Sequence, residues 1–123
     1  MVAAGAAVLA ATRRALQAAG IVVAGECGDA AGAVAAVTRL RPDVLVVDNE
    51  LTGGALVATA AVSTPAAPPP VLVIGPDAGG PERRAAELAG AADYLGGDLD
   101  GDRIADAVTD LVNETNRRKG DDT

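Results

Sequence analysis

Short apolar runs alternate along this chain with alanine-rich segments that favour helices. The run DVLVV at 43–47 is apolar after its first residue, and the run VLVI at 71–74 is apolar throughout. Strands without polar alternation are covered on both faces, as the central strands of parallel sheets are. Parallel strands also need long crossover connections, which helices usually supply. The sequence therefore predicts an α/β fold, a parallel sheet with helices on both faces.

Local start and stop signals set the element boundaries. Gly20 ends an alanine-rich run as a helix C-cap does, Asp29 is placed as the N-cap of a second helix, and Pro81 occupies the first turn of another. We predict one domain over residues 1–117, followed by a polar C-terminal tail at 118–123. The predicted helices are 6–19, 30–40, 55–63, 81–89 and 103–117, and the predicted strands are 21–25, 43–47, 71–74 and 91–95.

Composition excludes several kinds of function. The chain has 123 residues and a net charge of −7, which argues against direct binding to nucleic acid. It contains one Cys and no His, so an internal disulfide, a zinc site built on thiols and imidazoles, and a histidine-based triad are excluded. The apolar runs are shorter than the roughly 20 residues of a membrane helix. We expect a cytoplasmic protein that contacts no membrane.

Four stretches resemble, in order, the receiver domains of bacterial two-component response regulators. The stretches read GECGDAAGAVAAV, LRPDVLVVDNEL, VLVIGPDAG and LAGAADYLGGDLDGDRIADAV, and the resemblance extends over about residues 10–112. The resemblance implies a flavodoxin-like parallel sheet in the strand order 2-1-3-4-5. It also implies a role in phosphorelay signal transduction.

The resemblance assigns a role to five site positions, two of which match. Asp48 stands at the phospho-acceptor position, and Tyr94 stands at the position of the switch aromatic. The other three positions are degenerate. The acidic pair falls on Ala3 and Ala4, the hydroxyl residue falls on Gly75, and the lysine falls on Gly97.

These departures weaken the chemistry that the family performs. Phosphoryl transfer to a carboxylate gathers negative charge, and its catalysis depends on electrostatic stabilisation. Mg²⁺ needs hard oxygen ligands, and two of its usual carboxylates are replaced by alanine. We therefore expect a degenerate receiver without catalytic residues, without enzymatic activity and without Mg²⁺ or another cofactor.

The first strand is the part of the predicted sheet that the sequence supports least. The chain begins almost where this strand should end, so the strand is truncated or missing. It is central in the implied order, and an unpaired gap there would be costly. Three alternatives stay open. Residues 1–5 pair as a stub, a strand from another chain completes the sheet, or the natural protein begins upstream of Met1.

Our first functional hypothesis is an interaction or dimerisation module that works independently of phosphorylation. Its partner would be a protein or a second copy of the chain. A homodimer would form through the face of the fourth helix, fifth strand and fifth helix, or by exchange of the first strand. Tyr94 is the only aromatic residue, and we interpret it as a surface contact rather than a core residue.

Two alternatives belong to other classes of function. One is a regulator that accepts phosphate on Asp48 and controls transcription through a domain outside this chain. The other is a sensor of a small ligand, because alanine and glycine at the degenerate positions would leave a cleft at the top of the sheet. The expected lining of that pocket is Asp48, Asn49, Gly75, Pro76 and Gly96.

Overall fold

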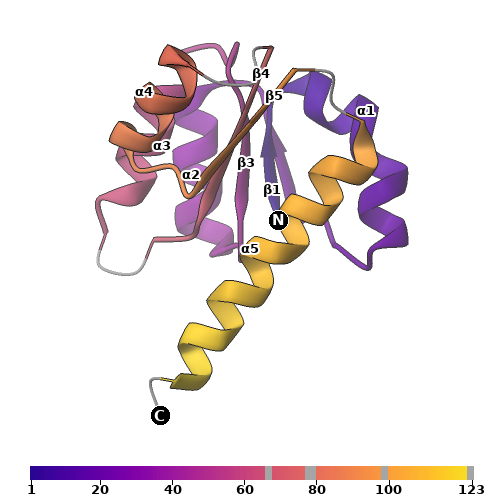
Figure 1. The fold of residues 1–123 in the computed structure, drawn as a ribbon. Helices are drawn as coiled ribbons and strands as arrows, with labels where there is room; N and C mark the ends of the chain where they lie inside the picture. The colour runs from indigo at the N-terminus through magenta and orange to yellow at the C-terminus, as the bar shows by residue number, and fades with distance from the viewer. Residues whose placement is uncertain (66–67, 77–79, 98–99, 122–123) are drawn as a thin grey trace.

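The computed structural model describes residues 1–65, 68–76, 80–97 and 100–121. For residues 6–11 and 118–121 it describes the backbone only. One parallel sheet has the strand order β2-β1-β3-β4-β5 (Figure 1), as the resemblance implied. Its strands are β1 (Val2–Ala4), β2 (Gly25–Cys27), β3 (Leu45–Asp48), β4 (Val71–Gly75) and β5 (Asp93–Gly96). The helices are α1 (Ala6–Ala18), α2 (Ala30–Leu40), α3 (Ala55–Ser63), α4 (Pro81–Ala89) and α5 (Gly101–Asp121).

The helices cover both faces of the sheet, so the core has two halves. Helices α2, α3 and α4 contribute Ala33, Ala58 and Ala86 to one half, and all three side chains are fully buried. Helices α1 and α5 contribute Leu16 and Val108 to the other half. Small side chains on the first face let helices approach the sheet closely. The predicted α/β class is therefore confirmed.

β1 is short, but it lies at the centre of the sheet and pairs on both sides. Val2 is in register with Gly25 of β2 and with Leu45 of β3. Val2, Ala3 and Ala4 are fully buried. The structure thus shows residues 2–4 paired as a stub, which was one of the three alternatives for the first strand. Within the described residues, the sheet is continuous without a strand from another chain.

The predicted strand at 21–25 is wrong in its position. β2 begins only at Gly25, because its partner β1 begins at Val2 and the parallel register joins these two residues. The apolar side chains of Ile21 and Val23 still pack against the core, and the amide of Ala24 donates to the carbonyl of Met1 at 2.8 Å. The hydrophobic pattern at 21–25 thus predicted which side chains pack against the core, but it did not predict where the strand pairing begins.

The last helix is longer than predicted. It continues to Asp121, so residues 118–121 belong to α5 and not to a separate tail. Figure 1 shows its C-terminal turns projecting beyond the body of the domain. Among the side chains of α5 that the structure describes, Leu111 is the last buried one. Among the described residues, no helix has both the length and the apolar character needed to cross a membrane.

Candidate functional site

Asp48 lies at the carboxyl edge of the sheet, where parallel α/β folds place their ligands. It is the last residue of β3 and is half-buried. Its Oδ1 accepts a hydrogen bond from the amide of Glu50 at 2.9 Å. The amide of Asn49 donates to the carbonyl of Ile74 at 2.7 Å and so prolongs the pairing of β3 with β4. The carboxylate is thus held at the edge of the sheet by its own turn.

The residue packed against Asp48 is Gly5, which the sequence did not single out. Gly5 precedes α1 with φ 117°, a backbone conformation that favours glycine. A Cβ built on Gly5 would lie 2.6 Å from the Cβ of Asp48. The only available signal was a glycine directly between a strand and a helix.

Ala3 and Ala4, predicted at the positions of the acidic pair, lie inside β1. Ala3 packs in the half of the core covered by α1 and α5, and Ala4 packs in the half covered by α2, α3 and α4. Both side chains are fully buried. Neither supplies an oxygen to the surroundings of Asp48.

At this edge of the sheet, the ring of Tyr94 lies against Gly75. A Cβ on Gly75 would collide with the hydroxyl of Tyr94 and lie 2.9 Å from its Cζ. Tyr94 is fully buried, so our interpretation of this residue as a surface contact is wrong. The physical reason is the missing side chain of Gly75, because the phenol group occupies the space that a larger residue in β4 would need. The buried aromatic residue and the glycine predicted at the hydroxyl position are therefore parts of one packing arrangement.

Arg83 of α4 contacts Tyr94 through a hydrogen bond and a cation–π interaction. Its Nη2 donates to the carbonyl of Tyr94 at 2.9 Å, and its guanidinium carbon lies 5.7 Å from the centroid of the ring. Its Nη1 lies 3.7 Å from Oδ1 of Asp93. Oδ1 of Asp93 also accepts from the amide of Tyr94 at 2.8 Å. These contacts join α4 to β5 around the buried ring.

The described residues near Asp48 do not fit a magnesium site of the kind that receiver chemistry implies. Gly5 and Gly75 carry no side-chain oxygen, and the space in front of Gly5 is taken by Asp48 itself. No group of three or more His, Cys, Asp and Glu side chains within the described residues is arranged to hold a metal ion. The amide of Gly97, which was predicted at the lysine position, donates a hydrogen bond to the carbonyl of Pro76 at 3.0 Å.

The five residues predicted to line a ligand pocket lie along this edge, but they do not line either of two surface hollows found in the described part of the chain. One hollow lies between β5 and α5, and the other lies between α1 and α5. Gly75 and Gly96 are buried and paired in register. The small-ligand hypothesis therefore gains no support from these hollows.

The thiol of Cys27 gives a first testable prediction. Burial raises its pKa above the ordinary value of 9.0, and the negative charge of Asp29 raises it further. The unfolded thiol ionises near pH 9 while the folded one keeps its proton, so the free energy of unfolding should fall as the pH rises above about 9. Iodoacetamide should also label the folded protein at pH 8 more slowly than a short peptide of the same sequence.

A substitution separates charge from burial as causes of this slow labelling. Asp29 caps α2 through a 2.7 Å hydrogen bond from the amide of Gly32. Asp29→Asn keeps a capping side chain and removes the charge. Labelling of Cys27 should become faster in this variant, and an unchanged rate would leave burial as the only cause.

Comparisons with known proteins agree with the fold and the strand order. Neither protein-family models nor curated protein sequences give a match. Among solved structures, the receiver domain of the response regulator NarL from Mycobacterium tuberculosis is 29% identical, covers 91% of this chain and 94% of its own, and has a TM-score of 0.81. A response regulator from Chloroflexus aurantiacus is 20% identical over 90% and 95% of the two chains, with a TM-score of 0.80.

A third similar structure contains a magnesium ion. The receiver domain of the sensor histidine kinase PA1611 from Pseudomonas aeruginosa is 18% identical, covers 91% of this chain and 96% of its own, and has a TM-score of 0.77. That structure holds a magnesium ion in its active-site cleft. The fold and these comparisons show that the chain is similar to receiver domains of response regulators over about nine-tenths of its length. The resemblance indicated by the sequence is thereby confirmed.

Proposed function

We propose that this chain is a degenerate receiver domain that acts as a protein-interaction module and does not depend on phosphorylation of Asp48. The observation that carries the proposal is the contact between Gly75 and Tyr94. Tyr94 is turned into the core because Gly75 leaves room for it. A glycine has no hydroxyl group with which to respond to a phosphoryl group on Asp48, so the position of the aromatic residue would not depend on phosphorylation.

The electrostatics around Asp48 support the same proposal. Phosphorylation would add negative charge to a carboxylate that packs against Gly5 and is in register with Ile74, and neither residue carries a charged side chain. In enzymes, the loss of one preorganised donor lowers the rate by about 10²–10³-fold. This site lacks the lysine, the hydroxyl and the acidic pair together. A non-enzymatic role through protein contacts is the function that remains for such a domain.

The surface proposed for these contacts is the face of α4, β5 and α5. β5 is an edge strand of the sheet, and α4 is fastened to it by Arg83. Because Tyr94 and Arg83 together fix the position of α4 against β5, the shape of this face follows from the buried ring. A protein partner would meet one fixed surface and not a switched one.

The experiment is phosphorylation by acetyl phosphate with Mg²⁺, followed by intact mass measurement. The PA1611 receiver domain serves as the positive control. We expect no acyl phosphate on this chain within the time in which the control is labelled, and no change in the melting temperature on addition of both reagents. Stoichiometric labelling that disappears in Asp48→Asn would contradict the proposal and would favour the phospho-accepting regulator.

A further inference from the structure

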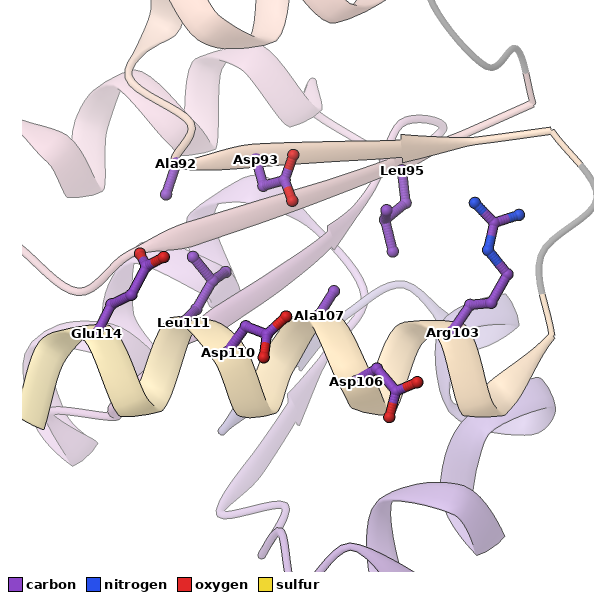
Figure 2. A pocket seen from close by; sticks show the side chains of 9 residues that line it. All are labelled: Ala92, Asp93, Leu95, Arg103, Asp106, Ala107, Asp110, Leu111 and Glu114. Carbon is purple, nitrogen blue, oxygen red and sulfur yellow. The ribbon is translucent and has the colours of Figure 1, made fainter.

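A shallow groove of about 400 Å³ lies between the edge strand β5 and the helix α5 (Figure 2). Leu95 from β5 and Ala107 and Leu111 from α5 form its apolar floor. Figure 2 shows the side chains of Leu95 and Leu111 pointing into the space between strand and helix. Leu111 is buried, while Leu95 and Ala107 are partly exposed. The groove therefore offers apolar surface next to a sheet edge.

The rim of this groove is strongly acidic. Asp106, Asp110 and Glu114 follow one another at intervals of four residues on α5, and Asp93 lines the groove from β5. Arg103 is the only basic residue in the lining. The rim thus carries four carboxylates and one guanidinium group.

The three carboxylates on α5 have no compensation that the structure describes. Asp106, Asp110 and Glu114 are exposed, and within the described residues none of their carboxylates takes part in a hydrogen bond or an ion pair. Like charges four residues apart destabilise a helix. A cationic partner bound along these three carboxylates would neutralise the repulsion between them, and it would also cover the apolar floor.

A second copy of the chain does not fit this rim. In a two-fold dimer through the groove, the same acidic patch would face itself, because such interfaces are formed by identical surfaces. The chain also carries a net charge of −7, which adds repulsion between copies. Charge complementarity instead favours a different molecule with positive charge.

We propose that the β5–α5 groove binds a cationic amphipathic helix of a partner protein. Its apolar side chains would rest on Leu95, Ala107 and Leu111, and its Lys and Arg residues would pair with the carboxylates of α5. Residues 103–114 span about 17 Å at roughly 1.5 Å per residue, so a helix of about three turns matches the groove. The inference deepens the proposed function, on which it rests, by giving the chemistry of the partner.

The experiment measures binding of a fluorescent, amidated 12-residue peptide by anisotropy at low ionic strength. The peptide carries leucines on one helical face and lysines beside them, and a matched peptide has glutamates in place of the lysines. The lysine peptide should bind, and its affinity should fall as salt is added. The glutamate peptide should not bind. Equal binding of both peptides, or no binding of either, would overturn the proposal.

Two triple variants locate the binding. Asp106→Lys/Asp110→Lys/Glu114→Lys reverses the rim, and Asp43→Lys/Glu50→Lys/Glu87→Lys makes the same change in net charge at exposed positions outside the groove. The rim variant should bind the lysine peptide about 10–100-fold more weakly than the wild-type protein, because each exposed pair contributes modestly. The control variant should bind nearly as the wild type does. Equal losses in both variants would show non-specific attraction and overturn the proposal.

Two further measurements keep the outcomes distinct. Amide chemical shifts of the ¹⁵N-labelled wild-type protein should change at β5 and α5 when the peptide is added. Changes confined to other elements would overturn the proposal. This measurement needs no variant, so it holds even if a variant fails to fold. Sedimentation should show a monomer, whereas a dimer that the rim variant abolishes would assign the groove to self-association instead. Failure of peptide binding rejects only this inference, since the phosphorylation assay tests the proposed function separately.

Discussion

Gly75→Ala should lower the free energy of unfolding by about 2–4 kcal/mol, although it adds a single methyl group. The new Cβ would meet the hydroxyl of Tyr94 and lie 2.9 Å from Cζ. Overpacking of a closed core costs about 1–3 kcal/mol, and partial expulsion of a large side chain adds the loss of its burial. Urea denaturation measures the change. Tyr94 is the only aromatic residue, so increased quenching of its fluorescence by acrylamide would report its movement directly.

Gly28→Ala is the matched control for this substitution. Gly28 has no atom within 4 Å of its built Cβ, and its φ lies outside the left-handed range. The same glycine-to-alanine change should therefore leave stability nearly unaltered there. If Gly28→Ala and Gly75→Ala cost the same, the contact with Tyr94 would not be the cause.

A double-mutant cycle tests the coupling between the two residues. Tyr94→Ala removes the ring, so Gly75→Ala should cost much less in that background than in the wild-type protein. Contacting residues show interaction energies of about 0.5–3 kcal/mol, and we expect a value in the upper half of that range. Strictly additive costs would contradict the interpretation that Gly75 is what keeps Tyr94 inside.

Local signals in the sequence predicted much of the fold. Asp29, the predicted N-cap, accepts a hydrogen bond from the amide of Gly32. Helix α4 begins at Pro81, as predicted. The apolar runs at 43–47 and 71–74 became β3 and β4, to within two residues at each end. These features depend on residues close together in the chain, so a single sequence contains them.

The features that the sequence missed depend on contacts between distant segments. The start of β2 is set by its register with β1, and hydrophobicity alone could not supply that register. The burial of Tyr94 depends on a glycine in the neighbouring strand. The contact of Gly5 with Asp48 joins two strand ends that only the sheet brings together. The candidate site was thus predicted in its position at the carboxyl edge, but not in its packing.

Gly5→Ala should be the second strongly destabilising substitution, with an expected loss of about 2–5 kcal/mol. Two costs combine at this position. The backbone has φ 117° and ψ 128°, where a side chain is strained by about 1–3 kcal/mol. The added Cβ would also lie 2.6 Å from the Cβ of Asp48, which brings an overpacking cost of about 1–3 kcal/mol. Thermal and urea denaturation would measure the sum.

Two companion variants separate these costs. Gly20 also has a positive φ, 76°, but no atom lies within 4 Å of its built Cβ. Gly20→Ala should therefore show a backbone cost alone, about 1–2 kcal/mol. Asp48→Gly removes the Cβ that Gly5→Ala would strike, so Gly5→Ala should cost less in that background. If the cost were the same there, backbone strain would account for all of it. If the cost falls, the contact with the Cβ of Asp48 accounts for part of it. Any side chain at position 5 would then meet Asp48, so Gly5→Asp could not place a second carboxylate beside it unless the backbone moved.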